Sequence, residues 1–334
     1  MLNPDKITLI AEISGNHYGD IEVAKALIES AHDCKADLVK LQAYTPDTIT
    51  IDSDEYTTVW QGKRTKLYDL YQKAHTPFEW FPELFKFAEK KGVKLFASVF
   101  DDTSVDMLEE LNCPIYKISS FELNDIPLLQ KVAATGKHTI LSTGMANAQE
   151  LVIAAKQFDP NKLTILHCNS AYPANPASAY LKNISFIQER LSPHTVGLSD
   201  HTRTNVTAIA AVALGARVIE KHFTFNSMGD GPDDHFSLEP ADFVKLRHDV
   251  NTALEAVGKR PRFGVKENEK NSANMRRSLF FVANIREGEK IKPEHIKSFR
   301  PCVGVEPVYY QDIIGKTASQ NIKANTPVQW ELIK

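Results

Sequence analysis

The sequence reads TVGLSDHT over residues 195–202, RTNVTAIAAVALG over 203–215 and ARVIEKHFT over 216–224. The first and last pieces are short apolar runs that end in polar clusters, and each cluster carries a histidine, His201 or His222. The middle piece is long enough for the helix that joins two parallel strands, and its final glycine suits a helix end. The pattern predicts a strand–helix–strand unit with both imidazoles at the carboxyl ends of adjacent strands, where they could hold a metal ion. The alternative is that both histidines are structural.

The same alternation of apolar runs and helix-like segments recurs along residues 1–255. Eight such repeats are typical of a (β/α)₈ TIM barrel, an α/β fold whose active site lies at the carboxyl ends of the strands. Polar residues follow all eight runs in phase, so we expect these ends to form one catalytic face. The runs are 7–13, 37–42, 94–98, 114–119, 138–142, 162–168, 195–199 and 216–222, with a longer insertion at 43–75.

The composition narrows the classes of function. The 334 residues carry a net charge of −3, which gives no reason to expect nucleic acid or a membrane surface as partner. The four cysteines are scattered without a C-x-x-C pair, as free thiols in a reducing compartment are. No secretory signal pattern opens the sequence, and no apolar run approaches ~20 residues, so we expect a cytoplasmic protein without a membrane span.

Two lysines, Lys40 and Lys117, interrupt apolar strands. A buried lysine is unfavourable unless it meets an anion, and the alternative is an outward lysine whose head reaches water. Together with nearby hydroxyl and backbone donors, the two lysines predict a pocket for a multiply charged anion, such as a phosphate with a carboxylate. The run STGM at 142–145, just before a helix, is a weak candidate for a phosphate cradle.

Other polar residues of the predicted face are less decisive. Glu12 lies near the two histidines of the predicted metal site, and His17 is a further candidate ligand for which a structural role is equally open. His167 belongs either to the pocket or to the core. Asp233 lies in the acidic, glycine-rich loop 229–240, which is either a solvated turn or a loop over the predicted face whose Asp233 could hydrogen-bond polyol hydroxyls.

A second domain follows the barrel. Residues 256–275 are polar and charged, which indicates a linker, and 276–334 form a strand-rich tail with an internal repeat. Residues 283–297 align with 320–334, and the alignment pairs Gly288 with Asn325, the two residue types that best tolerate a positive φ. We expect a small pseudo-symmetric β module that docks on the barrel or on a partner subunit.

These motifs resemble the sialic acid synthase family, over nearly the whole chain. In the family's order they are AEISGNH, KLQ, YKISSFE, LSTGM, LHCxxxYP, GLSDH and EKHFT, and the tail resembles the family's antifreeze-like (SAF) domain. The resemblance implies a metal-dependent transferase that condenses phosphoenolpyruvate (PEP) with an N-acetylated sugar. It also implies a domain-swapped homodimer.

The resemblance implies roles for particular residues. His201 and His222 match the metal ligands, usually of Mn²⁺, with Mg²⁺ or Co²⁺ as alternatives, and Glu12 matches a catalytic carboxylate beside them. The positions that match PEP contacts are Lys40, Ser98, Lys117, Ser120, Ser142, Gly144, Ser170 and Ser199. The positions that match sugar contacts are Gln42, Glu122, Tyr172, Asp233 and, reaching in from the second chain, Arg300 of the partner subunit.

Within the family, residues 44–50 and 66–80 resemble the pseudaminic acid synthase branch, as does Ser170. That branch implies 2,4-diacetamido-2,4,6-trideoxy-L-altrose as acceptor, with N-acetylneuraminate or legionaminate synthesis as alternatives. One departure is Val99, where the family commonly has proline, which puts the loop shape and the donor set around Ser98 in doubt. Two other classes stay open on residues alone: a Schiff-base aldolase, because the pocket contains lysines, and a non-catalytic binding protein.

Overall fold

The computed structural model describes residues 2–60 and 62–334. The chain forms two compact units, Met1–Gly258 and Lys259–Lys334. No helix within the described residues combines the length and the apolar character needed to cross a bilayer.

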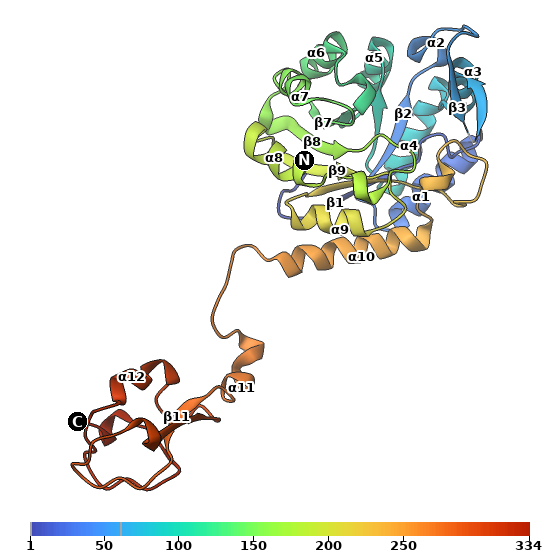
Figure 1. Ribbon diagram of the computed structural model, residues 1–334. Helices are drawn as coiled ribbons and strands as arrows, with labels where there is room; N and C mark the ends of the chain where they lie inside the picture. Colours follow the sequence, from blue (N-terminus) through green and yellow to red (C-terminus); the bar gives the residue numbers. More distant parts are fainter. Residues whose placement is uncertain (1, 61) are drawn as a thin grey trace. The chain divides into compact units, whose positions relative to one another are not determined.

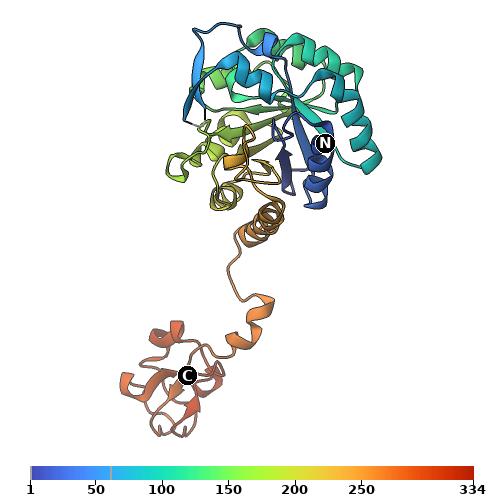
Figure 2. The ribbon, with the colours of Figure 1, turned by 90° about the vertical axis from the view of Figure 1, so that its right-hand side faces the viewer.

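The first unit is a closed barrel of parallel strands ringed by helices (Figures 1 and 2). All eight predicted strands are present, within one or two residues of the expected bounds. In spatial order they are β1 (Thr8–Glu12), β10 (Val218–His222), β9 (Thr195–Ser199), β8 (Leu163–Cys168), β7 (His138–Ser142), β6 (Ile115–Ile118), β5 (Leu95–Val99) and β2 (Leu38–Ala43). The predicted TIM barrel is therefore confirmed.

The outer helices pack apolar stripes against the strands. The helices are α1 (Ile21–Asp33), α4 (Phe81–Lys91), α5 (Asp102–Glu110), α6 (Ile126–Ala134), α7 (Ala148–Ala155), α8 (Lys182–Leu191), α9 (Val206–Ala213) and α10 (Pro240–Val257). Of these, α1, α5, α6 and α7 begin with a polar side chain that caps the helix. Asn147, for example, caps the helix that follows β7, and its side chain accepts from the backbone N–H of Glu150. The helix predicted within 203–215 is α9, which α10 covers on the outside (Figure 1).

The strands β9 and β10 lie unusually close together. A Cβ on Gly197 would lie 2.1 Å from the carbonyl oxygen of Val218, so only glycine fits at this point of β9. Gly197 pairs with Val218 and Ser199 pairs with Glu220 in the register. One step further along come Asp200 and Lys221, and then the two histidines.

The insertion between β2 and α4 contains structure that the sequence analysis did not predict. A short helix, α2 (Pro46–Ile49), leads to an antiparallel hairpin of β3 (Thr57–Trp60) and β4 (Lys63–Lys66), and then to α3 (Leu67–Ala74). An ion pair between Lys66 and Asp52, at 2.5 Å, ties the hairpin to the preceding loop.

The second unit is a small β module with its own apolar core. Its sheet has the order β12 (Ile296–Phe299), β11 (Ser278–Phe281), β13 (Thr326–Pro327), and it also contains α11 (Lys270–Ala273) and α12 (Tyr310–Ile313). The predicted repeat is confirmed: Ile285 and Ile322, which are equivalent in the alignment, form a mutual β-bridge. Gly288 and Asn325 both have positive φ, 75° and 67°, as the alignment predicts.

Candidate active site

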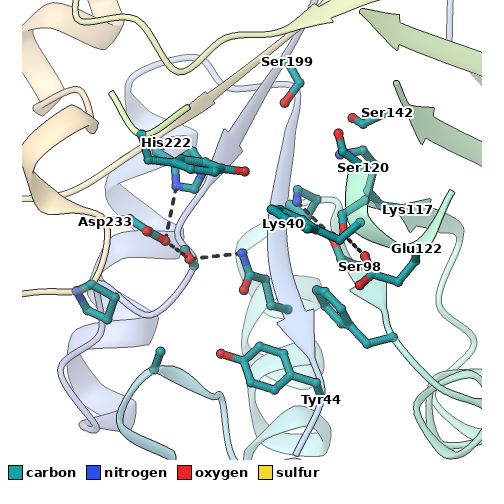
Figure 3. Close-up of a pocket in the computed structure, with 18 of the residues that line it drawn as sticks. Lys40, Tyr44, Ser98, Lys117, Ser120, Glu122, Ser142, Ser199, His222 and Asp233 are labelled. Carbon is teal, nitrogen blue, oxygen red and sulfur yellow. Dashed lines mark hydrogen bonds and ion pairs between the residues drawn. The ribbon is translucent and has the colours of Figure 1, made fainter. Parts of the chain in front are cut away.

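A pocket of about 450 Å³ opens at the carboxyl ends of the barrel strands. Figure 3 shows its polar side chains converging, with Lys117, Ser98, Ser120 and Ser142 on one side, His222 and Asp233 on the other, and Ser199 between the two sides. Twelve of the predicted site residues line it: Lys40, Gln42, Ser98, Lys117, Ser120, Glu122, Ser142, Tyr172, Ser199, His201, His222 and Asp233.

The two strand lysines point into the barrel, so the alternative of outward lysines is wrong. Lys40 Nζ lies 2.5 Å from Glu12 Oε2 and donates to Ser98 Oγ at 2.9 Å. Val99, for which we expected a disturbed loop, is the last residue of β5 and pairs with Ala43 and Ile118. Ser98 therefore keeps its orientation toward the lysine.

Glu220 is a pocket residue that the sequence analysis did not select. Its Oε1 lies 3.2 Å from Lys117 Nζ and 3.5 Å from Lys40 Nζ, and it accepts from Ser199 Oγ at 3.2 Å. Burial alone would raise the pKa of Glu220, but the two lysines hold it well below its usual range. The only sequence signal was its place two residues before His222, on the inward face of the same strand.

Glu12 is buried between the lysine and histidine sides of the pocket. Its strand pairs it with Lys40 on one side and with His222 on the other. Gln42 Nε2 donates to Glu12 Oε1 at 3.2 Å. Burial raises the pKa of this carboxyl group, although Lys40 opposes the shift. Unlike Glu220, Glu12 is thus shifted toward accepting a proton.

The serines and Gly144 form a tight cradle beside the lysines. The backbone N–H of Gly144 donates to Ser120 Oγ at 3.0 Å. A Cβ on Gly144 would lie 2.0 Å from Ser170 Oγ, so a larger residue would fill this corner. Ser142 Oγ is buried and has no hydrogen-bond partner within the described residues. Buried polar atoms are rarely left unpartnered, which indicates that a ligand completes the cradle.

The histidine pair suits a divalent metal. The rings of His201 and His222 lie 5.3 Å apart, centroid to centroid. His201 Nδ1 donates to the carbonyl oxygen of Asn169 at 2.8 Å, which leaves Nε2 with its lone pair in the neutral ring. His222 Nδ1 is buried and has no hydrogen-bond partner among residues 2–60 and 62–334. Burial lowers the pKa of His222, so this ring stays neutral, the form that binds metals.

The metal site would be incomplete on protein ligands alone. Across the part of the chain that the structure describes, no three His, Cys, Asp or Glu side chains come together as a metal cage. Asp233 Oδ2 is 3.6 Å from His222 Nδ1, and Ser14 Oγ donates to the same carboxylate. Catalytic zinc sites usually have three protein ligands, so an ion held by these two imidazoles would need water or substrate at its other positions.

The far side of the pocket is apolar. Figure 3 shows Tyr44 across the pocket from His222 and Ser199. The ring of Tyr44 contacts those of Tyr71 and Phe100 edge to face, at 5.7 and 5.1 Å. Here the insertion contributes Ile49, Trp60, Leu70, Tyr71 and Ala74 to the lining, which we call the apolar wall.

Several predicted residues lie elsewhere or have other partners. His17 is buried away from the pocket, where Nδ1 accepts from the N–H of Gly19 at 3.1 Å and Nε2 contacts Thr76 Oγ1 at 3.2 Å, so it is structural. His167 Nε2 donates to the carbonyl oxygen of Ala179 at 2.5 Å and lines a separate cavity. Arg300 is exposed in the second unit, just after β12.

Comparison with known proteins explains this combination of residues. The sequence model of the NeuB family matches residues 27–262, and that of the SAF domain matches residues 276–334. The chain belongs to the NeuB family.

Relatives of this NeuB-family chain are named as synthases of sialic acid or of related sugar acids. It is 40% identical to a pseudaminic acid synthase of Helicobacter pylori, over 98% of this chain and 97% of that protein. It is 36% identical to an N,N'-diacetyllegionaminic acid synthase of Campylobacter jejuni, over 95% and 97% of the two chains. The crystal structure of an N-acetylneuraminic acid (sialic acid) synthetase of Leptospira borgpetersenii, in complex with citrate, superposes with a TM-score of 0.73. That protein is 30% identical, with 81% of this chain and 91% of the other covered.

Proposed function

We propose that this protein is a pseudaminic acid synthase, which condenses PEP with 2,4-diacetamido-2,4,6-trideoxy-L-altrose and releases phosphate. The observation that carries the proposal is the pocket itself. Two buried lysines and an unpartnered serine hydroxyl lie opposite two histidines with free ring nitrogens. An anion would accept from the lysines and the serine at one end, and a divalent cation held by the ring nitrogens would bind a carbonyl oxygen at the other.

Lys40 and Lys117 are assigned to the charges of PEP. Each is almost fully buried. Among the described residues, Lys40 forms ion pairs with Glu12 and Glu220, and Lys117 with Glu220. A phosphate and a carboxylate would take over part of this compensation, with Ser98, Ser120, Ser142 and the N–H of Gly144 as additional donors. Ser170 Oγ lies beside Gly144, and Ser199 lines the pocket and donates to Glu220.

His201 and His222 are assigned to a divalent cation, with Mn²⁺ as the expected ion and Mg²⁺ or Co²⁺ as alternatives. When bound, the cation supplies Lewis acidity that polarises the aldehyde of the open-chain sugar. The carbonyl oxygen of Asn169 holds the Nδ1 proton of His201 and so fixes which nitrogen of that ring remains free.

The carbon–carbon bond forms between C3 of PEP and the sugar aldehyde carbon. The alkoxide that the aldehyde becomes takes up a proton, and the C2 cation adds water. The tetrahedral product then loses phosphate by cleavage of the bond between C2 and the phosphate oxygen, and its C2 hydroxyl loses a proton to become the ketone. Glu12, whose pKa is raised by burial, accepts the proton of that water. Lys40, 2.5 Å from Glu12, stabilises the phosphate leaving group.

The acceptor assignment rests on the apolar wall and on the relatives. Gln42, Glu122, Tyr172 and Asp233 offer polar contacts for the sugar, whereas the far side is lined mainly by apolar surface, such as Leu70 and the ring of Trp60. A 6-deoxy sugar ends in a methyl group, which suits such a wall. The alternatives are legionaminate or N-acetylneuraminate synthesis, as the names of other relatives suggest.

A Schiff-base aldolase remains a second candidate on one observation. Burial lowers the pKa of Lys117, which is the change that a nucleophilic amine requires. Borohydride treatment with pyruvate would trap an adduct on Lys117 or Lys40 in that case, and activity would resist chelators.

We further propose that the protein works as a domain-swapped homodimer in the cytoplasm. Arg300 is exposed on the SAF domain and makes no ion pair within the described residues, so it is available to a neighbouring chain. The free cysteines Cys34, Cys113, Cys168 and Cys302 suit a reducing compartment.

Turnover in ¹⁸O-labelled water tests the chemistry. The proposal predicts that the label enters the C2 oxygen of the sugar acid and that phosphate stays unlabelled. Label in the phosphate would mean P–O cleavage and would remove the proposed C2–O step.

A further inference from the structure

Behind the two histidines, on the outer face of β9 and β10, lies a buried ion pair with no contact to the pocket. Lys221 Nζ is 3.0 Å from Asp200 Oδ2, and both side chains are almost completely buried. Lys221 precedes His222 and Asp200 precedes His201. Because successive side chains of a strand point to opposite faces, this pair points outward where the histidines point inward.

Every polar atom of the pair has a partner. The ammonium group of Lys221 donates to Asp200, to the carbonyl oxygen of Thr202 and, at 3.2 Å, to that of Thr204. Asp200 Oδ1 accepts from the N–H of Thr202 at 3.0 Å, and Oδ2 accepts from Thr207 Oγ1 at 2.7 Å. All three ammonium protons and both carboxylate oxygens are used, so the group has one well-defined arrangement.

The group spans the segment that carries His201. Lys221 belongs to β10, Thr207 belongs to α9, and Asp200 to Thr204 form the loop between β9 and α9. The bonds from Lys221 therefore fix this loop directly against the strand that ends in His222. Earlier along the same two strands, the close contact between Gly197 of β9 and Val218 of β10 also limits how far the strands can shift.

We propose that Asp200 and Lys221 form a clasp whose function is to set the separation and orientation of His201 and His222 for metal binding. The clasp residues are positioning residues: they touch neither substrate nor metal. The inference rests on the proposed metal site, because its purpose is to preorganise the two imidazoles. Groups that orient metal ligands in this way typically change metal affinity by about 10- to 100-fold when they are replaced.

The test is the affinity of the metal-free protein for Mn²⁺, measured from the electron paramagnetic resonance signal of free Mn²⁺ during titration. Asp200→Asn is the main variant, because it keeps the size of the side chain and the acceptor for Thr202. Lys221→Met removes the positive charge, the other half of the ion pair. We expect each folded variant to bind Mn²⁺ about 10- to 100-fold more weakly than the wild type. Saturating Mn²⁺ should restore most of kcat.

Asp37→Asn is the matched control. Asp37 also accepts from a backbone N–H, that of Leu9 at 2.7 Å, and pairs with an arginine, Arg247, but it precedes β2 at the opposite end of the barrel. It should lose thermal stability without losing Mn²⁺ affinity.

Wild-type Mn²⁺ affinity in a folded Asp200→Asn protein would overturn the clasp, and so would an equal loss of affinity in Asp37→Asn. If Lys221→Met does not fold, Asp200→Asn decides the question alone. A wild-type protein that binds none of Mn²⁺, Mg²⁺ and Co²⁺ would overturn the metal site itself. That failure is visible before any variant is made.

Discussion

Oε1 of Glu220 lies 3.2 Å from Nζ of Lys117, and both side chains are buried inside the barrel. The protein therefore balances its pocket lysines with carboxylates of its own. An anionic substrate has to share these lysines with Glu220, so the carboxylate limits how strongly the pocket holds an anion.

Replacing Glu220 by glutamine should show how much this carboxylate compensates the charges of Lys40 and Lys117. Removal of one partner of a buried ion pair destabilises a protein by about 3–5 kcal/mol, because the remaining charge is uncompensated. PEP would then supply the missing negative charge, so its addition should raise the melting temperature of Glu220→Gln more than that of the wild type. Calorimetry with and without PEP measures both effects.

Glu109→Gln is the control for the Glu220 experiment, because Glu109 pairs with Lys137 near the surface at 2.6 Å. It should change neither stability nor the PEP response by much. A PEP-induced rise that is smaller in Glu220→Gln than in the wild type would argue against anion binding at the lysines.

The apolar wall should discriminate between acceptors at C6. Leu70→Ser places a hydroxyl group where we expect the sugar's terminal methyl group. A hydrophobic pocket disfavours an added hydroxyl by about 100-fold, and the serine should remove much of that preference. The measurement is the ratio of kcat/KM for a 6-deoxy acceptor and its 6-hydroxy analogue.

Val59→Ser makes the same kind of change on the hairpin of the insertion, where the side chain is 74% exposed and does not line the pocket. It should leave the ratio unchanged. Equal ratios in the wild type and in Leu70→Ser would show that the wall does not recognise C6.

His17 should make the barrel sensitive to acid. Burial lowers its pKa from 6.5 to about 4. Between these values the unfolded chain binds a proton that the folded protein excludes, so stability falls as the pH falls through this window. The loss contributed by His17 approaches about 3 kcal/mol at pH 4.

Denaturant unfolding at pH 7 and pH 4.5 measures the contribution of His17. In His17→Gln the difference in unfolding free energy between the two pH values should be smaller than in the wild type. An unchanged difference would assign the acid sensitivity to other groups, such as His138, whose pKa burial also lowers to about 4.

Arg300 should act in trans. Arg300→Ala and Lys117→Met should each abolish most activity. If Arg300 of one chain completes the barrel of the other, a mixed dimer contains one intact site, and equal co-refolding should restore about a quarter of wild-type activity. A mixture no more active than the separate variants would contradict the swapped arrangement.

The barrel was predictable because its signal is repeated. Each apolar run and its polar end add the same information, so an error in one strand does not change the fold. The internal repeat of the tail was predictable for a similar reason, since Gly288 and Asn325 occupy equivalent positions that both require a positive φ. By contrast, β4 reads KRTK and lacks any alternation of apolar and polar residues, so the hairpin of the insertion gave no strand signal.

The site was predictable in its residue types but not in its partners. A lysine in an apolar strand requires an anion, which identified Lys40 and Lys117. Their partner Glu220 comes from a strand 103 residues beyond Lys117, and the register that aligns them is a tertiary property. For His17 the residue type was misleading. Its contact with Thr76, 59 residues away, makes it structural, and no local sequence pattern distinguishes this role from metal binding.

The most direct test of the account is a competition for the enzyme between acceptor sugars. PEP and Mn²⁺ are supplied with an equimolar mixture of 2,4-diacetamido-2,4,6-trideoxy-L-altrose, its legionaminate-type isomer and N-acetylmannosamine, and the products are separated and identified by mass spectrometry and NMR. The account predicts stoichiometric phosphate release, abolished by a chelator, with pseudaminic acid as the main product. Product from N-acetylmannosamine, with none from the diacetamido altrose, would contradict it.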